Sequence, residues 1–192
     1  RLATQIGSNL LHQPQGGKGL LLGGLPGAER GRVVVIGAGN AGGNATAMAA
    51  AMGAEVVVFD LRSERLVTMR QFGNNVTALY PYRDAIKREV AAADLLIAAA
   101  LKTGQRAPHI VSRDSVRSMQ PGSVIIDISV DQGGCVETTR PTTYEDPTYI
   151  EEGVLHFSVT NMPGAVPRSA SQALSAVLLP CVHSLLRPDW ED

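Results

Sequence analysis

Short apolar runs alternate with helical patterns along most of the chain. Residues 33–36 are all Val or Ile, a run typical of a parallel strand that is covered on both faces. Further apolar runs that predict strands occupy residues 55–60, 76–80, 94–100, 123–130 and 154–159. Stretches with helical spacing occupy residues 40–52, 62–71, 84–93 and 112–119. This alternation predicts an α/β fold, a doubly wound parallel sheet of the Rossmann type.

The two ends of the chain and residues 137–153 depart from this alternation. Residues 1–12 predict a short amphipathic helix, and residues 20–22, in the glycine-rich stretch that follows, predict a short strand or hairpin arm. Residues 137–153 have no clear period and contain two prolines, so we expect an excursion outside the sheet. The last helix, from Ser169 or Ser171 onward, has a wide apolar stripe, which predicts packing against a neighbour not fully represented in this sequence.

The first predicted strand runs directly into the sequence Gly-Ala-Gly-Asn-Ala-Gly at residues 37–42. In a strand–turn–helix unit, the first glycine permits a tight turn, the second leaves room for a pyrophosphate, and the third lets the helix lie close to the strand. The helix directs its free backbone N–H groups and the positive end of its dipole at a phosphate. The pattern predicts a dinucleotide-binding turn, and the alternative is a structural glycine turn that binds no nucleotide.

The second predicted strand ends in Asp60, whose carboxylate can accept hydrogen bonds from both hydroxyls of an adenosine ribose. A negative charge at this position repels the 2′-phosphate of NADP, whereas Arg62, two residues later, could attract it. We therefore expect NAD rather than NADP as the cofactor.

The composition is that of a soluble globular protein. The chain has 192 residues, of which 44% are hydrophobic and 18% charged, and its net charge is −1. No basic cluster indicates a nucleic-acid or membrane partner, and the longest low-charge stretch, residues 91–101, is interrupted by Asp94. Cys135 and Cys181 are far apart and no secretory signal is evident, so we expect a reducing, cytoplasmic location.

Three loops follow predicted strands at the edge of the sheet where doubly wound folds bind ligands, at residues 101–108, 131–135 and 160–167. Asp131 begins the second loop, although a turn made only to reverse the chain would also explain it. The four histidines are scattered without metal-ligand spacing, so no metal site is predicted. Cys135 has no identifiable partner base, which favours a small loop residue over a nucleophile.

Four separated blocks, in this order, resemble the alanine dehydrogenase / pyridine nucleotide transhydrogenase family, and specifically its alanine dehydrogenases. The transhydrogenase subunit looks different around residues 131 and 161, so it is the weaker match. The resemblance extends over residues 15–190. The blocks are the glycine turn at 37–42, Asp-Gln-Gly-Gly-Cys at 131–135, Arg-Pro-Thr-Thr-Tyr at 140–144 and Asn-Met-Pro-Gly-Ala-Val-Pro at 161–167.

The resemblance implies a homo-oligomeric NAD-dependent oxidoreductase that reversibly deaminates L-alanine to pyruvate and ammonia, with hydride transfer to the nicotinamide. It implies that Asp131 is a catalytic carboxylate, which handles water and protons during imine hydrolysis. It also implies that Asp60 holds the adenosine ribose. The implied cofactor-binding residues are Gly37, Ala38, Gly39, Asn40, Ala41, Gly42, Asp60, Leu61, Leu101, Ile128, Val130, Asn161 and Met162.

The sequence also departs from the family. The family's substrate-binding lysine, histidine and arginine belong to a substrate domain formed from sequence before and after the nucleotide domain, and we expect this sequence to begin after the first part and to end within or before the second. Pro81 and Tyr82 stand where small polar residues are expected near the adenosine, and Gly43 where a larger residue is common.

We therefore expect a chain that binds NAD and is catalytically incomplete by itself. The alternative is a nucleotide-sensing or interaction module without chemistry. The expected parts are a lead-in helix and glycine-rich linker at residues 1–30, an NAD-binding Rossmann domain at 31–166, and a C-terminal helix at 167–192 that leads toward an absent substrate domain.

Overall fold

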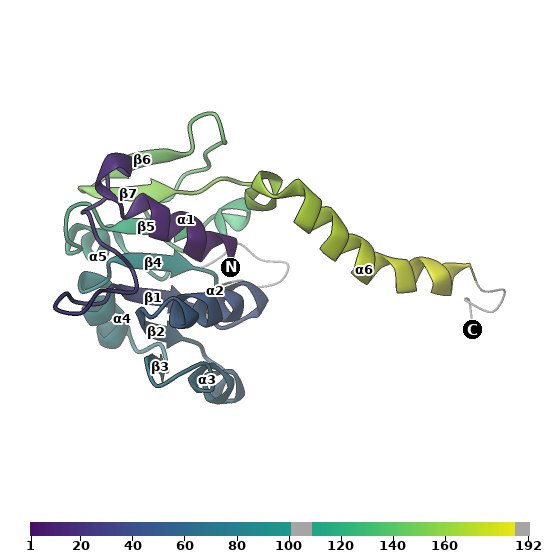
Figure 1. Ribbon diagram of the computed structural model, residues 1–192, viewed down its shortest axis with the longest axis horizontal. Helices are drawn as coiled ribbons and strands as arrows, with labels where there is room; N and C mark the ends of the chain where they lie inside the picture. The colour runs from purple at the N-terminus through teal and green to yellow at the C-terminus, as the bar shows by residue number, and fades with distance from the viewer. Residues whose placement is uncertain (101–108, 187–192) are drawn as a thin grey trace. The chain divides into compact units, whose positions relative to one another are not determined.

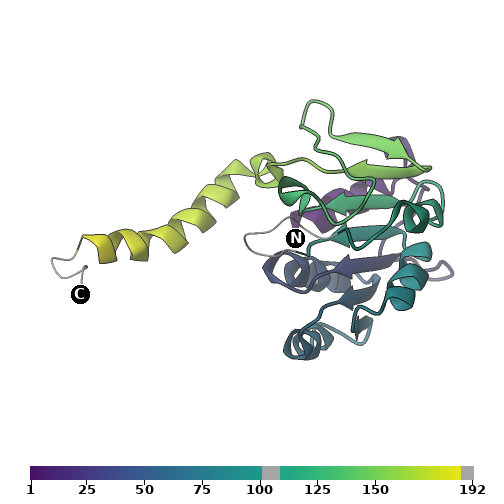
Figure 2. The same cartoon turned by 180° about the vertical axis from the view of Figure 1, so that it is seen from behind.

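A computed structural model of the chain describes residues 1–100 and 109–186 (Figure 1). The chain divides into two compact units, Arg1–Thr160 and Asn161–Asp192, which are described separately below. Within the described residues, the first unit holds one seven-stranded sheet in the order β3-β2-β1-β4-β5-β7-β6. Figure 2 shows the sheet from the opposite side, with the strands side by side in this order.

The elements of the first unit follow the predicted alternation of strand and helix. Its helices are α1 (Leu2–Leu10), η1 (Gln13–Gln15), α2 (Asn40–Ala51), α3 (Ser63–Arg70), α4 (Arg83–Ala91), α5 (Arg113–Arg117) and η2 (Val130–Gln132). Its strands are β1 (Arg32–Ile36), β2 (Glu55–Phe59), β3 (Val76–Leu79), β4 (Leu95–Ala98), β5 (Val124–Asp127), β6 (Thr148–Glu151) and β7 (Val154–Phe157).

All strands are parallel except β6, which pairs antiparallel with β7 at the edge of the described sheet. The order of the parallel strands is that of a doubly wound dinucleotide-binding fold, with β7 as its sixth strand. The predicted fold class is therefore confirmed.

Both faces of the sheet are covered, which explains why the strands are apolar throughout instead of alternating. The helices α1, α2 and α3 pack together over one face, while α4 and α5 cover the other (Figure 1). Ile86 and Val90 of α4 and Val116 of α5 pack there with Val34 and Leu96 of the sheet. Burying one such side chain fully stabilises the fold by about 1.5–3 kcal/mol.

The helix α1 lies unusually close to the sheet. A Cβ atom on Gly7 would lie 2.5 Å from Cδ1 of Leu95 and 3.2 Å from Cδ1 of Ile126. The glycine therefore lets the backbone of α1 rest on the side chains of β4 and β5.

The structure corrects the expectation that residues 137–153 lie outside the sheet, because β6 is part of it. The strand is short and lies at the edge, and Ile150 is 67% exposed, so its sequence lacks the apolar pattern of a covered strand. Residues 20–22 form no strand. Leu22 is nevertheless fully buried, and its carbonyl accepts a hydrogen bond from the N–H of Gly31.

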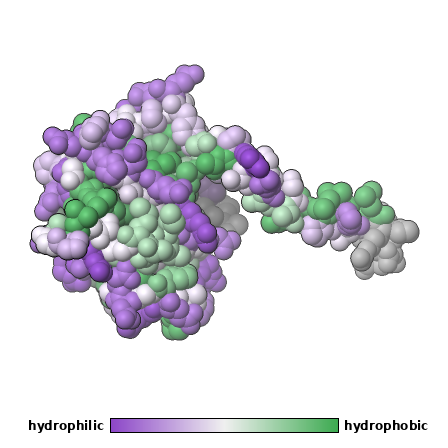
Figure 3. Space-filling view, viewed as in Figure 1, coloured by the Kyte–Doolittle hydropathy of each residue, from purple (hydrophilic) through white to green (hydrophobic). Residues whose placement is uncertain are grey.

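The second unit consists of η3 (Met162–Ala165) and α6 (Pro167–Leu185). The helix begins at Pro167, ahead of the serines predicted to start it, because the fixed φ of proline suits the first helical position. No residue of α6 is buried, and Leu174, Val177 and Leu185 are at least 60% exposed (Figure 3). That its apolar stripe packs against a neighbour stays a prediction. None of the helices in the described ranges is both long and apolar enough for a membrane span.

His156 of β7 is a fully buried titratable side chain. Its Nδ1 lies 2.9 Å from the carbonyl oxygen of Val154, which can only accept, so Nδ1 carries the proton and Nε2 accepts from the hydroxyl of Thr138 at 2.8 Å. The ring of Tyr149 stacks on the imidazole, with the centroids 4.9 Å apart. Burial lowers the pKa of His156.

We expect acidification to destabilise the chain through His156. Its pKa is about 6.5 in an unfolded chain and lower in the folded one, so the folded state binds the proton less readily. The stabilisation is complete above the unfolded pKa and falls as the pH drops below it, by at most about 1.4 kcal/mol per pH unit. Chemical unfolding between about pH 5 and 8 measures this slope. The variant His156→Gln should lose this part of the slope, and an identical slope in the variant would contradict the prediction.

Candidate functional site

The site lies at the carboxyl ends of β1 and β4, where the strand order reverses. From β1 the chain crosses to β2 on one side, and β4 and β5 continue the sheet on the other. The N–H of Gly37 donates to the carbonyl of Phe59 at 2.8 Å, and the N–H of Ala99 donates to that of Ile36 at 2.8 Å. These bonds align the ends of three strands around the crevice in which doubly wound folds bind ligands.

Two glycines of the turn after β1 are required by the protein itself. Gly37 has a φ of +96°, and a Cβ there would lie 2.9 Å from the carbonyl oxygen of Ala99. A Cβ on Gly42 would lie 1.7 Å from the carbonyl oxygen of Gly37. The first glycine makes the turn, and the second lets α2 approach the end of β1.

Gly39 is different, because the fold does not require a glycine at this position. Its φ of −72° and ψ of −165° are accessible to any residue. Among the described atoms, a Cβ there would come within 4 Å of Nη1 of Arg65 alone, at 3.7 Å. No side chain caps α2 at this residue, and no acidic residue lies in the first turn. The space above Gly39 and the helix amides therefore fit a diphosphate group.

Asp60 connects this turn to the next strand. The carboxylate is 8% exposed. Its Oδ2 accepts from the N–H of Ala38 at 2.7 Å and from Nη1 of Arg65 at 3.3 Å, and its Oδ1 accepts from the N–H of Arg62 at 2.9 Å. Asp60 thus follows directly after β2, close to the strand end that the sequence predicted, and it holds the glycine turn in place.

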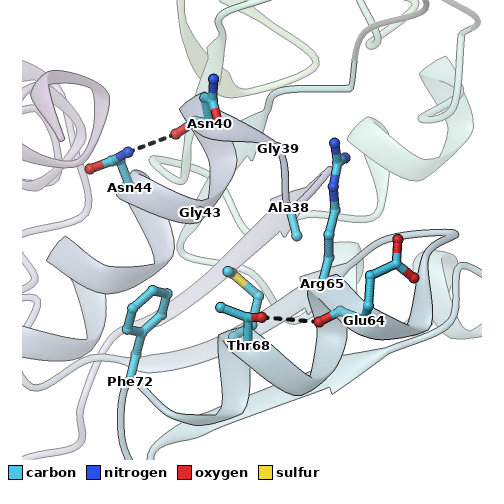
Figure 4. A pocket seen from close by; sticks show the side chains of 10 residues that line it. Ala38, Gly39, Asn40, Gly43, Asn44, Glu64, Arg65, Thr68 and Phe72 are labelled. Atoms are coloured by element: carbon cyan, nitrogen blue, oxygen red, sulfur yellow. Dashed lines mark hydrogen bonds between the residues drawn. The ribbon is translucent and has the colours of Figure 1, made fainter.

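A cleft of about 410 Å³ opens between the first turn of α2 and the helix α3 (Figure 4). The side chain of Arg65 rises from α3 toward Ala38 and Gly39 along this cleft. Gly43 and Met69 also line the cleft, and a Cβ on Gly43 would lie 3.3 Å from Cε of Met69. The remaining lining residues are Asn40, Asn44, Glu64, Thr68 and Phe72.

The loop after β5 is organised by a second buried carboxylate. Asp127 is fully buried and accepts backbone N–H groups from Ser129 at 2.9 Å, Cys135 at 2.8 Å and Val136 at 3.2 Å. Burial raises the pKa of Asp127, and these hydrogen bonds oppose that rise. The loop that they close carries Asp131 in the turn η2, where it is exposed.

The same loop is tied to the end of β4. The carbonyl of Ala100 accepts from the hydroxyl of Ser129 at 2.8 Å and from the thiol of Cys135 at 3.0 Å. Burial raises the pKa of the Cys135 thiol to about 11, so it is protonated at neutral pH. Cys135 therefore supports the loop and is not poised as a nucleophile.

The structure places the other predicted residues in different surroundings. Leu61 is 69% exposed, Ile128 is half-buried, and Val130 is buried within η2 instead of continuing β5. The strand ends at Asp127 because its carboxylate turns the chain at Ser129. Leu101 lies outside the described residues. Asn161 and Met162 belong to the second unit, in which Asn161 is exposed and Met162 is buried.

Tyr80 and Tyr82 follow β3, beside the end of β2. The centroids of their rings lie 4.9 Å apart. Tyr80 is 47% exposed and Tyr82 is 69% exposed. The unexpected Pro81–Tyr82 sequence thus places a pair of exposed aromatic rings near Asp60, whose N–H donates to the carbonyl of Leu79 at 3.3 Å.

Two residues of the site escaped the sequence analysis. Asp127 gave a usable signal, because an acid inside an otherwise apolar strand needs hydrogen-bond donors if it is buried. Arg65 gave none, since a basic residue on an exposed helix turn is ordinary. Its proximity to Asp60 and Gly39 appears only in three dimensions.

The strand order, the glycine turn and the acid at the end of β2 define a dinucleotide-binding domain of the Rossmann type. The sequence matches the family described as "Alanine dehydrogenase/PNT, C-terminal domain" over residues 3–192, and the chain belongs to this family.

Relatives of known name agree with this assignment. An alanine dehydrogenase of Bacillus subtilis is 48% identical over 182 residues, which are 94% of this chain and 48% of the relative. A solved structure of an L-alanine dehydrogenase has a TM-score of 0.93 at 48% identity and covers 98% of this chain and 53% of its own. A transhydrogenase of Sinorhizobium meliloti, with a TM-score of 0.79 at 24% identity over 96% of this chain and 55% of its own, shares the fold. The chain spans about half the length of the curated relatives that it matches.

We expect Asp127→Asn to loosen the loop that carries Asp131. Both oxygens of the carboxylate accept hydrogen bonds from backbone N–H groups. In the variant, the amide NH₂ group replaces one of these oxygens, so at least one buried N–H group loses its acceptor. The free energy of unfolding should fall by about 2–4 kcal/mol. Hydrogen exchange of the Ser129, Cys135 and Val136 amides should accelerate, as measured by mass spectrometry.

The matched control is Asp114→Asn, at an acid of α5 whose side chain is 88% exposed. It should change the free energy of unfolding by no more than about 0.5 kcal/mol. If the amides of Cys135 and Val136 exchange as slowly in Asp127→Asn as in the parent chain, Asp127 does not hold the loop.

Proposed function

We propose that this chain is the nucleotide-binding part of an NAD-dependent alanine dehydrogenase. The whole enzyme would interconvert L-alanine with pyruvate and ammonia, and this part alone would bind NAD without completing catalysis. The observation that carries the proposal is Gly39. The fold does not require a glycine at this position, which lies at the N-terminus of α2, where no side chain caps the helix. Family membership and the named relatives support the choice of reaction.

The residues at the carboxyl ends of β1 and β2 have different proposed roles in binding the dinucleotide. Gly37 and Gly42 shape the turn, and the amides at Gly39, Asn40 and Ala41 would face the diphosphate. Asp60 would accept the hydroxyls of the adenosine ribose, with Leu61 beside it. Bound NAD supplies a nicotinamide ring that accepts a hydride. Leu101, Ile128, Val130, Asn161 and Met162 stay proposed neighbours of the cofactor.

Asp131 is the proposed catalytic residue of this part. Oxidation of L-alanine removes a hydride from Cα and a proton from the amino group, and water then converts the imine to pyruvate and ammonia. An exposed carboxylate at the carboxyl edge of the sheet can accept the proton of that water and return it to the leaving ammonia. The hydrogen bonds to Asp127 would hold the loop while Asp131 exchanges protons.

The wider context belongs to the same proposal. The substrate-binding groups would come from a separate substrate domain, and the parts of this chain would be residues 1–30, 31–166 and 167–192. We propose a homo-oligomer in the cytoplasm. A transhydrogenase subunit is the weaker alternative, because the alanine dehydrogenase structure matches at twice the sequence identity.

We expect Gly39→Ala to weaken dinucleotide binding without unfolding the chain. The added methyl group meets no backbone atom and stands where the diphosphate would approach. Isothermal titration with NADH should show a Kd at least roughly tenfold weaker than that of the parent chain, the loss of about one charge-assisted hydrogen bond. The free energy of unfolding should stay within about 0.5 kcal/mol.

Gly42→Ala is the contrasting variant. Its methyl group would overlap the carbonyl of Gly37, so this variant should lose the fold itself. If Gly39→Ala binds NADH as the parent does, the proposed diphosphate position is wrong.

We expect Asp131→Ala to slow alanine oxidation strongly once the missing part of the enzyme is supplied. The chain would be joined to the part of an alanine dehydrogenase that it does not cover, and NADH formation would be followed by absorbance. The rate should fall by about 10²–10⁴, the usual contribution of a general acid–base group. NADH binding should persist, and Gln132→Ala, at the next exposed residue, should keep the rate. Full activity of Asp131→Ala would favour a module without this chemistry.

A further inference from the structure

The loop that carries Asp131 is closed by hydrogen bonds between its own backbone groups. The carbonyl of Ser129 accepts the N–H of Gln132 at 2.9 Å and the N–H of Gly134 at 3.1 Å. Gly133 and Gly134, with φ values of +96° and +73°, make the tight turn that these bonds require. The bonds enclose Asp131, so a displacement of Ser129 carries Asp131 with it.

Both ends of this loop are bound to one atom, the carbonyl oxygen of Ala100 just after β4. The hydroxyl of Ser129 donates to this oxygen at 2.8 Å, and the thiol of Cys135 donates to it at 3.0 Å. A carbonyl oxygen has two lone pairs, so the two donors use both of them. Ser129 is 7% exposed and Cys135 is fully buried, so this connection lies inside the protein.

Ala100 also lies against the glycine turn of the proposed dinucleotide site. A Cβ on Gly37 would lie 2.9 Å from the carbonyl oxygen of Ala99 and 3.0 Å from the backbone N and Cα atoms of Ala100. The N–H of Ala99 donates to the carbonyl of Ile36, the residue before the turn, at 2.8 Å. The turn therefore meets the end of β4 backbone to backbone, without a flexible side chain that could absorb a displacement.

We propose that Ser129 and Cys135 are positioning residues, which transmit the position of the glycine turn to Asp131 through the carbonyl of Ala100. A diphosphate bound to the amides of the turn would fix the turn, and the backbone contacts would then fix the loop. Asp131 would be held for proton transfer when the nucleotide is bound. The inference rests on the proposed function and adds two residues that are not among its proposed ligand-binding residues.

The hydrogen bonds of Asp127 do not provide this connection. Its carboxylate accepts backbone N–H groups of the loop and of the residue directly after it, so it ties the loop to β5. In the sheet, β4 lies between β5 and β1. The bonds to Ala100 reach the end of β4, and β4 pairs with β1 and lies against Gly37.

The first test uses adenosine diphosphate (ADP), which carries the adenosine and the diphosphate but lacks the nicotinamide. Titration of the ¹⁵N-labelled chain with ADP should shift the amide resonance of Gly39. The amide resonances of Asp131 and Gly133 should shift with the same Kd, because the loop follows the turn. Since ADP has no nicotinamide, this response of the loop cannot come from a contact with that ring.

Variants of the two donors test the route. A double variant, Ser129→Ala with Cys135→Ala, should bind ADP with a Kd within about twofold of the parent value. The response of the Asp131 and Gly133 amides should be lost, because the loop no longer donates to Ala100. Ser129→Ala with Cys135→Ser keeps one hydroxyl donor and should restore the response. Ser129→Ala alone should weaken it, because the remaining thiol is a weak donor.

Alanine oxidation gives a second readout once the chain is joined to the missing part of the enzyme. The double variant should lower kcat by roughly tenfold or more, because a misplaced general acid–base group transfers protons less effectively. The Kd for NADH should stay within about twofold, and Cys135→Ser in place of Cys135→Ala should recover kcat.

The matched control is Ser118→Ala at the end of α5. It removes a hydrogen bond of 2.7 Å from a hydroxyl to a backbone carbonyl, that of Ser115, away from the site. This variant should change neither kcat nor the Kd for NADH. Circular dichroism checks that each variant is folded.

The outcomes separate this inference from the proposed function. A chain that binds neither ADP nor NADH contradicts the proposed function, and this inference with it. If NADH alone binds, the same comparison of parent and variants is made with NADH. Binding that moves Gly39 but leaves Asp131 and Gly133 unmoved overturns the inference alone, and so does a double variant that keeps the parental response or kcat. If the double variant does not fold, Ser129→Ala decides, and a parental response in it overturns the inference.

Discussion

The close approach of α2 to the end of β1 is the constraint on which the rest of the site depends. At Gly42 a single Cβ would lie 1.7 Å from the carbonyl oxygen of Gly37, so any side chain would push the helix away from the strand. The contact brings the first turn of α2 over the carboxyl edge of the sheet. The N–H of Ala38 can then reach Asp60, which fixes the turn against the neighbouring strand.

Two buried carboxylates build the carboxyl edge in the same way. Asp60 and Asp127 each follow or end an apolar strand, and each accepts the backbone N–H of the residue two positions later. The second oxygen of each then holds a loop: Asp60 holds the glycine turn, and Asp127 holds the segment before Cys135. Asp60 is also paired with Arg65, whose side chain is 35% exposed, whereas Asp127 is fully buried.

Local chemistry explains which parts of the fold the sequence could predict. The apolar strands, the helices between them and the glycine turn each depend on neighbouring residues in the sequence. The strands and helices were therefore predicted with nearly correct bounds. The strand β6 was missed because an edge strand needs no apolar pattern, and Ile150 faces solvent. The end of β5 was placed too late, because Val130 is as apolar as the strand, although Asp127 has already turned the chain.

The candidate site, like the fold, could be predicted only where its cause lies in neighbouring residues of the sequence. The glycines are predictable because their steric reasons are local. Only the structure distinguishes Gly39, where the fold does not require a glycine, from Gly37 and Gly42, where it does. Arg65 reaches Asp60 through the packing of α3 beside α2, which no spacing rule reveals. The carboxyl-edge geometry alone is compatible with many dinucleotide-dependent reactions, so the proposed reaction class rests on family membership.

The central claim is that the amides at the start of α2 receive a diphosphate while Asp60 holds a ribose. The most direct measurement is a titration of ¹⁵N-labelled chain with NADH, followed by the backbone amide resonances. The largest shifts should fall on Gly39, Asn40 and Ala41, with smaller ones at Asp60 and Arg62, all with one Kd. Shifts confined to other parts of the chain, with these amides unmoved at saturation, would contradict the claim.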